Sequence, residues 1–520
     1  MSTRSRSWIQ GSIVICDLAP SLSVIGIEIE CMDPLVKCTI LLIILGLVGN
    51  AFSINDYDHC ENVVKKWATT SIKNERNEDK HTLKDLLFFL HVPRTGGRTY
   101  FHCFLTKLYL SSLECPRSYD KLRFDPSKEK CRLLVTHDDY SITSKLPRDR
   151  TSVVTILRNP IDRVFSTYEF SVEVAARFLV HPNLTYAKLM TGRLRFKSIG
   201  VSTLEIWPWK YLVPWMRDDL FARRDARKAR GTNDVTSNDP YNMQDVAMPL
   251  LNYINDPIAH EIVHNGATFQ IAGLTNNSYL PESHEVRHCV DKYHNLGDYV
   301  LQVAKKRLDN MLYVGLTENH RESATMFANV VGQQVISQLA NSKAIGEGAT
   351  LNRSERSSSF SDSELDQNTN SDEKGNETKS SSDDNDVKQE SMTVGKLMDT
   401  YEVCISSLRK TQTRRRIASL KRIPPANFTK EARLQVPKMV LQQIQSLNKL
   451  DIELYEYAKG IFVKQHKQAA ESLFDTETLG SIFVYSGGIK LWDACLWTMP
   501  FVLLFILLFV NAKRTLKVKI

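Results

Sequence analysis

The stretch LLFFLHVPRTGGRTYFHCFLTKLYL, from Leu86 to Leu110, contains an apolar run, a turn and a segment with helical spacing. The turn holds Pro93, two consecutive glycines and two arginines. Where a strand ends in such a turn and a helix begins, unpaired backbone N–H groups and the positive end of the helix dipole converge. The stretch therefore predicts a strand, an anion-binding loop and a helix, in that order.

The predicted loop runs from Pro93 to Thr99 and offers three kinds of anion-binding group. Glycines let an anion approach the backbone, threonines supply hydroxyl donors, and arginines supply charged forks suited to phosphate or sulfate. The candidate ligands are Arg94, Thr95, Gly96, Gly97, Arg98 and Thr99. The loop matches neither GxxxxGK[ST] nor GxGxxG, which disfavours an ordinary ATPase and a Rossmann dehydrogenase. The alternative is a tight turn whose arginines are solvated.

Two further apolar runs, CRLLVTH and TSVVTILRNP, follow the loop, and the second leads into the helix-like IDRVFSTYEFSVEVAARFL. Apolar runs that alternate with helices are typical of parallel strands joined by crossover helices. The chain is therefore predicted to be an α/β protein with a central parallel sheet flanked by helices. In such sheets ligands bind where strands end and helices begin, which is where the loop lies.

The other two runs place polar candidates at the same edge of the predicted sheet. Arg158 ends an apolar strand, Pro160 suits the start of a helix, and Ser166 follows about two turns later, which indicates a second anion site. Two anion sites at neighbouring strand ends suit a nucleotide with phosphates at both ends. His137 ends another strand, and a neutral histidine there can accept a proton from an attacking hydroxyl. The alternative for His137 is a structural role.

Composition bounds the remaining possibilities. The chain has 520 residues, of which 42% are hydrophobic and 24% charged, enough for one large or two ordinary domains. A net charge of +8 without an arginine-rich block indicates no nucleic-acid partner. No CxxC or clustered Cys/His spacing suggests zinc, and we expect no metal.

Both ends of the chain carry apolar segments that we assign to the secretory pathway. Residues 32–52 resemble a cleavable signal peptide, and residues 1–31 then come from an upstream start codon; a signal anchor is the alternative. Residues 491–511 are predicted to span a membrane, with the basic tail 512–520 in the cytosol and everything before it in the lumen. Glycosylation sequons fit the lumen and occur at Asn183, Asn276, Asn352, Asn376 and Asn427.

Cysteines and polar segments organise the part between the two apolar ends. Three disulfides are possible, with 15 pairings open, among Cys60, Cys103, Cys115, Cys131, Cys289 and Cys404. A stretch rich in Ser, Asp, Glu and Asn cannot bury enough apolar surface to fold and is predicted to be disordered. The predicted order is a polar lead-in (53–84), the main domain (85–340), this insertion (341–392) and a helical continuation of the main domain (393–485).

Taken together, these motifs resemble the Golgi sulfotransferases. FLHVPRTGGRT, THDDYS, ILRNPIDRVFS and YVGLTENHRESATMF are similar to the heparan sulfate 6-O-sulfotransferase group, as is NGATFQIAGL. The resemblance covers roughly residues 86–330, with weaker support near LNKLDIELYEYA. It implies a P-loop-like sulfotransferase fold, 3'-phosphoadenosine 5'-phosphosulfate as sulfate donor, and His137 as base. The 5'-phosphosulfate would lie in the loop and the 3'-phosphate near Arg158 and Ser166.

Two departures from the 6-O-sulfotransferase group refine the resemblance. Arg94 stands where that group carries lysine, and the anchor is C-terminal rather than N-terminal. Both features are similar to plant tyrosylprotein sulfotransferases. That implies sulfation of tyrosines in acidic secreted precursors, by a single-pass type I Golgi membrane enzyme in which Arg94 stabilises the leaving phosphate. The alternatives are a polysaccharide 6-O-sulfotransferase and a lumenal binding protein without turnover. Basic candidates for contacting an acidic acceptor are Arg123, Arg132 and Lys145.

Overall fold

A computed structural model of the chain describes residues 56–75, 80–116, 121–180, 203–231, 238–345, 392–424 and 426–477, with single residues at 39, 183 and 185. The leader, most of the predicted signal peptide and insertion, the predicted span at 491–511 and the basic tail lie outside these ranges. Within them, no helix combines the length and apolar character that crossing a bilayer requires. Residues 1–459 and 460–520 form separate units, and the sheet described below belongs to the first.

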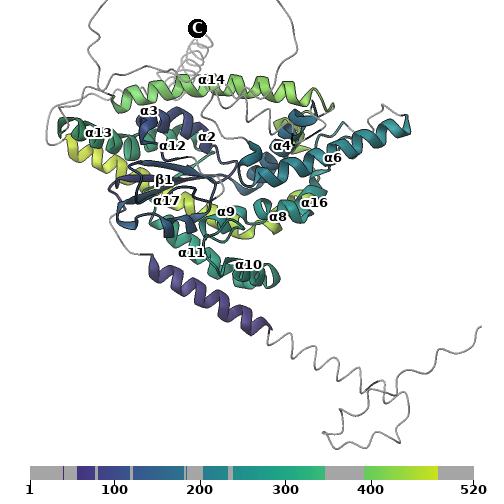
Figure 1. Ribbon diagram of the computed structural model, residues 1–520, viewed down its shortest axis with the longest axis horizontal. Coiled ribbons are helices and arrows are strands. Elements are labelled where there is room, and N and C mark those ends of the chain that lie inside the picture. Colours follow the sequence, from purple (N-terminus) through teal and green to yellow (C-terminus); the bar gives the residue numbers. More distant parts are fainter. Residues whose placement is uncertain are drawn as a thin grey trace, which may run out of the picture. The chain divides into compact units, whose positions relative to one another are not determined.

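A four-stranded sheet forms the centre of the first unit (Figure 1). Its strands are β1 (Leu86–Leu90), β2 (Leu133–Thr136), β3 (Thr151–Leu157) and β4 (Tyr313–Leu316). They run parallel in the order β2-β1-β3-β4. Leu90 pairs with Thr136 on one side and Thr155 on the other, so the strands end together at one edge. The predicted α/β class with a central parallel sheet is confirmed.

Helices cover both faces of the sheet, which explains why β1 is buried along its whole length. In Figure 1, α12 and α14 lie on one side of the sheet and α9 and α11 on the other. A continuous helical stretch follows β1, made of α2 (Gly97–Tyr100), the π-helical η3 (Phe101–Leu105) and α3 (Thr106–Leu108). The other helices between β3 and the insertion are α4 (Pro160–Arg177), α6 (Trp209–Arg230), α7 (Leu250–Asn255), α8 (Pro257–Val263), α9 (Gly266–Ile271), α10 (Ser283–Lys292), α11 (Gly297–Asp309), α12 (His320–Phe327) and α13 (Gln333–Ile345).

Helix α4 begins where the sequence predicted a helix after Arg158, and its start has a clear local cause. The side chain of Asn159 accepts hydrogen bonds from the backbone N–H groups of Ile161 and Asp162. Pro160 occupies the first helical position, where its missing N–H leaves no acceptor unpaired. These two residues fix the direction in which α4 leaves the end of β3.

The segment after the insertion is helical and packs against α4 and η3. Its helices are α14 (Val394–Leu420), α15 (Lys430–Leu434), α16 (Lys438–Leu447) and α17 (Lys449–Glu477). Asp451 at the start of α17 forms a buried ion pair with Arg163 of α4, with 2.7 Å between nitrogen and oxygen. The same carboxylate accepts the backbone N–H of Thr268 at 2.7 Å and so caps α9. One buried group therefore joins three helices.

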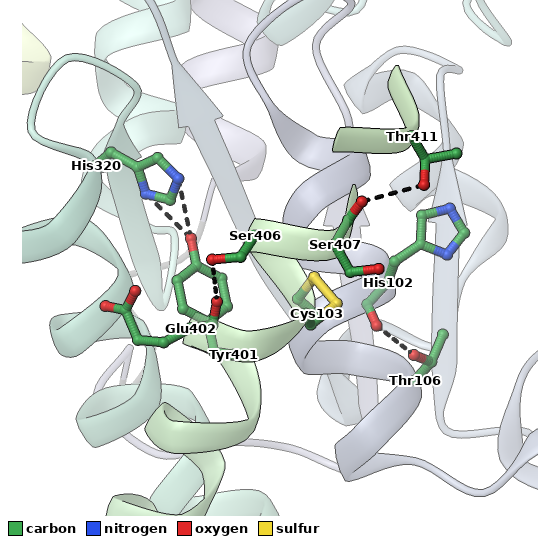
Figure 2. Close-up of a disulfide and its surroundings, with 10 residues drawn as sticks. His102, Cys103, Thr106, His320, Tyr401, Glu402, Ser406, Ser407 and Thr411 are labelled. Atoms are coloured by element: carbon green, nitrogen blue, oxygen red, sulfur yellow. Dashed lines mark hydrogen bonds between the residues drawn. A yellow bond between two sulfur atoms is a disulfide. The ribbon is translucent and has the colours of Figure 1, made fainter. Parts of the chain in front are cut away.

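Three disulfides connect the six cysteines, which confirms the expected number: Cys60–Cys289, Cys103–Cys404 and Cys115–Cys131. The Cys103–Cys404 bond links the helical stretch after β1 to α14. Figure 2 shows its surroundings, where the Tyr401 hydroxyl points at His320 and lies 3.0 Å from its Nδ1. Tyr401 also stacks on Phe104, with ring centroids 4.1 Å apart. The segment after the insertion is thus held covalently and by packing beside the predicted loop.

Candidate active site

The carboxyl ends of the four strands bring the candidate residues to one edge of the sheet. His91 and the predicted loop follow β1, His137 follows β2, Arg158 follows β3 and Thr317 follows β4. Because the strands are parallel and in register, these residues approach one another although they are far apart in the chain. This is the arrangement the sequence predicted for the loop, His137 and Arg158.

The loop has a defined backbone conformation that hydrogen bonds hold. Arg94 and Gly96 have φ angles of 68° and 85°, in the left-handed region. The Thr95 hydroxyl donates to the carbonyl of Val92 at 2.8 Å, and the Thr317 hydroxyl donates to the carbonyl of Thr95 at 2.6 Å. Thr95 is buried, so its hydroxyl shapes the loop from within. The Thr95 hydroxyl is therefore used within the loop, and the contact of Thr95 with an anion stays a prediction.

Gly97 has a steric reason to be glycine. A Cβ built there would lie 2.3 Å from Cδ2 and 2.5 Å from Nε2 of His91. The imidazole of His91 thus occupies the space over the glycine. Glycine is therefore needed at position 97 to make room for the His91 ring. This requirement is separate from the exposed backbone N–H groups that an anion would bind.

Arg94 is held by helix α4. Its Nε donates to the Ser166 hydroxyl at 3.0 Å, and its guanidinium carbon lies 4.3 Å from the centre of the Phe170 ring. Burial, followed by the charge of Arg158, lowers the pKa of Arg94 to about 10. Arg94 therefore keeps its charge at neutral pH. The structure joins the two predicted anion sites directly, because Ser166 contacts Arg94.

Arg158 lies beside the loop. One of its terminal nitrogens, Nη1, donates to the carbonyl of Arg94 at 3.2 Å, and its Nε lies 3.9 Å from Oε1 of Glu318. The same Glu318 oxygen accepts the backbone N–H of Asn159 at 3.0 Å. Burial lowers the pKa of Arg158 from its usual value. The arginine therefore sits between a loop carbonyl and a carboxylate, close to where an anion would bind.

His137 and His91 face each other at the ends of β2 and β1. Their ring centroids are 4.3 Å apart. Burial, and after it the neighbouring His91 and Arg94, lowers the pKa of His137 well below its usual value. Burial and then Arg94 lower the pKa of His91 to about 3. Both imidazoles are neutral at neutral pH, as a proton acceptor has to be.

A buried glutamine fixes the backbone that carries both histidines. Nε2 of Gln270, on α9, lies 2.8 Å from the carbonyl oxygen of His137 and 3.3 Å from those of His91 and Asp138. Gln270 lies within the stretch NGATFQIAGL, which the sequence marked only by resemblance. Gln270 and His91 were missed as site residues, and so were Thr317 and Glu318 in YVGLTENH.

Of the basic residues suggested for acceptor binding, Arg132 is not brought to this edge. Arg132 directly precedes β2, whereas His137 directly follows it, so the two lie at opposite ends of that strand. Arg123 and Lys145 are exposed. Across the described ranges, no group of three or more His, Cys, Asp or Glu side chains is placed to hold a metal.

Comparison with known proteins adds a close relative. The chain is 57% identical over 505 residues to a protein-tyrosine sulfotransferase of Arabidopsis thaliana. The match covers 94% of this chain and 100% of that protein. No family model matches the chain.

Proposed function

The chain belongs to the protein-tyrosine sulfotransferase family, and from this premise we propose that it transfers sulfate from 3'-phosphoadenosine 5'-phosphosulfate to tyrosine hydroxyls of secreted proteins or peptides. The observation that carries the proposal is the pairing of a charged Arg94, held by Ser166 and Phe170, with a neutral His137 at the same edge of the sheet. Arg94 would bind the anionic donor, and His137 would accept the proton of the acceptor hydroxyl.

His137 accepts the proton in this reaction. A phenol, with pKa about 10, is almost fully protonated at neutral pH, so its oxygen needs a base as it attacks sulfur. A bond forms between that oxygen and sulfur, and the bond from sulfur to the 5'-phosphate oxygen breaks. General-base catalysis of this kind contributes about 10² to 10⁴ in rate. Gln270 orients the base through the His137 carbonyl.

Arg94 meets the charge that develops on the departing phosphate. Its pKa of about 10 leaves it protonated at neutral pH, so it acts as a fixed positive charge and does not donate a proton. Arg158 adds a second positive charge beside the loop and, with Ser166, is the proposed contact for the 3'-phosphate. The products are the sulfated tyrosine and 3'-phosphoadenosine 5'-phosphate.

We place the reaction in the Golgi lumen, with the chain as a single-pass type I membrane protein. Three disulfides support an oxidising compartment. The proposed span at 491–511 and its basic tail rest on the sequence. Acidic, tyrosine-containing precursors are the proposed acceptors.

To test the proposal, the purified full-length chain is incubated with labelled donor and, in parallel reactions, with one of two acceptors. These are an Asp-Tyr peptide and desulfated heparan polysaccharide. We expect label on the peptide tyrosine. Label only on the polysaccharide would replace the proposed acceptor by a sugar hydroxyl, and no transfer to either would favour a binding protein without turnover.

A variant tests the role of the base. His137→Ala should lower kcat by about 10² to 10⁴ and leave the Kd for 3'-phosphoadenosine 5'-phosphate near the wild-type value. Equal loss of catalysis and of nucleotide binding would contradict the assignment of His137 as base.

A further inference from the structure

Helix α4 presents acidic side chains on the face that holds the donor-site arginine. Asp162, Ser166, Glu169 and Glu173 are spaced by three or four residues and so share one face of the helix. Arg94 lies on this face, because its Nε bonds to Ser166 and its guanidinium packs on Phe170. Three carboxylates therefore lie on the same side of α4 as the contacts that hold Arg94.

Such carboxylates oppose the binding of a polyanion in two ways. Each repels the phosphates, and each competes with them for Arg94 and Arg158. In the partly buried setting of a protein surface these interactions are several times stronger than in bulk water. A donor site built against α4 therefore works only if these acidic groups are neutralised by other partners.

Arginines from outside the loop provide that neutralisation. Glu169 is buried and lies 2.7 Å from Nη2 of Arg433 and 3.3 Å from Nη2 of Arg416; it also accepts the Tyr241 hydroxyl at 2.8 Å. Asp162 lies 3.0 Å from Nη1 of Arg433, so this one arginine bridges two carboxylates. The third, Glu173, pairs within α4 with Arg177 at 2.8 Å.

The two arginines that pair with Glu169 come from the segment after the insertion. Arg416 lies on α14 and Arg433 on α15. Arg416 also donates to the carbonyl of Phe428 at 2.9 Å, in the connection that leads from α14 to α15. The Cys103–Cys404 disulfide fixes α14 to the helical stretch that starts in the loop (Figure 2). The positive charges that neutralise Glu169 and Asp162 thus come from residues more than 200 positions further along the chain.

We propose that Arg433 and Arg416 are positioning residues for the donor site: they neutralise Glu169 and Asp162, and thereby keep Arg94 and Arg158 available for the phosphate groups of the donor. The inference rests on the proposed function, because it assumes an anionic nucleotide at this edge. It assigns Arg433 no direct contact with the donor. Arg433 acts through the carboxylates.

The experiment measures the Kd of 3'-phosphoadenosine 5'-phosphate by calorimetry on the purified full-length chain, with thermal melting as a check on folding. Arg433→Gln should raise the Kd about tenfold to thirtyfold, because the buried carboxylate of Glu169, on the helix face that holds Arg94, loses its nearest arginine. Arg416→Gln should raise it about threefold, since Arg433 remains. The matched control is Arg414→Gln, which changes an exposed arginine in the same run of α14.

The removal of the carboxylate separates this role from a structural one. Glu169→Gln alone should bind the nucleotide at least as tightly as wild type, and in the double variant Glu169→Gln/Arg433→Gln the Kd should return to within about threefold of wild type. A folded Arg433→Gln with wild-type Kd would overturn the inference, as would a folded double variant that binds as weakly as Arg433→Gln. If Arg433→Gln does not fold, Arg416→Gln decides instead: its expected threefold rise in Kd should disappear in Glu169→Gln/Arg416→Gln, and a folded Arg416→Gln with wild-type Kd would overturn the inference. Wild-type protein that binds no nucleotide would reject the proposed donor itself, and this inference with it.

Discussion

Gly97→Ala should damage catalysis through a single steric contact. The new Cβ would lie 2.3 Å from Cδ2 of His91, whereas carbon atoms in ordinary contact are about 3.5 to 4.0 Å apart. The imidazole of His91 therefore has to move by roughly 1 Å. Overpacking of this kind costs about 1–3 kcal/mol of stability.

The displaced ring is a neighbour of the proposed base. The centroids of His91 and His137 are 4.3 Å apart, so a displaced His91 ring pushes the His137 imidazole out of position. Gln270 holds the backbone carbonyls of both residues, so the backbone cannot shift freely to relieve the contact. Misplacement of a reacting group by about 1 Å is worth about 10² in rate. We therefore expect kcat to fall about 10²-fold at saturating donor.

The neighbouring glycine supplies a matched control. In Gly96→Ala the new Cβ meets nothing closer than Cγ2 of Thr317 at 3.9 Å, so no ring is displaced. The φ angle of 85° makes alanine strained there by about 1–2 kcal/mol, which is similar to the stability cost expected at Gly97. Gly96 is exposed in the loop that is proposed to bind the donor. We therefore expect a higher KM for the donor but a kcat within about threefold of wild type.

The assay is steady-state transfer from labelled donor to an Asp-Tyr peptide, with both substrates saturating, combined with thermal melting of both variants. Similar melting temperatures with a large loss of kcat only in Gly97→Ala would support the steric argument. A folded Gly97→Ala with kcat within threefold of wild type would refute it, because the close contact with His91 would then have no bearing on the base.

Three further predictions concern pH and stability. Because burial holds the pKa of His137 well below its usual value, the base stays neutral as the pH falls from 7.5 to 6.5, so kcat/KM should be flat over that range and decline only at lower pH; an acid limb near pH 7 would contradict this. Cys404→Ser removes a crosslink between residues 301 positions apart, and the urea midpoint should drop by the equivalent of about 2–5 kcal/mol; an unchanged midpoint would mean that packing alone holds α14. Asp451→Asn leaves the buried Arg163 without its counter-charge and should cost about 3–5 kcal/mol in denaturant unfolding, with a loss below about 1 kcal/mol as the contrary result.

Local pattern was sufficient to predict the centre of the fold. The apolar runs at β1 and β3 have no alternation because both faces of the sheet are covered, and such runs between helices indicate parallel strands. The start of α4 could be predicted from Pro160, and the structure adds the cap at Asn159. The parallel direction then places every strand end at one edge, which is why the loop, His137 and Arg158 were predicted together.

The missed residues act through contacts that sequence spacing does not reveal. His91 was counted within an apolar run, because the sequence pattern locates the end of a strand only to within one or two residues. Gln270 reaches the carbonyl of His137 from a position 133 residues away, and Arg433 reaches Glu169 across 264. Arg132 was proposed for the acceptor by its charge alone, and it lies at the wrong end of β2. The charge of Arg132 alone did not reveal at which end of β2 the residue lies.

Arg94 is charged at neutral pH and His137 is neutral, and the charge of Arg94 is one cause of the neutral state of His137. Arg94 contributes to lowering the pKa of His137, after burial and His91, so the site places a weak base beside a fixed positive charge. A phosphate bound to Arg94 would offset that charge and allow the pKa of His137 to rise toward its usual value. Because Arg94 retains its proton with a pKa of about 10, the proposed reaction moves only one proton, from the acceptor to His137. In the proposed mechanism the same arginine therefore stabilises the leaving group and makes the pKa of the base depend on whether the donor is bound.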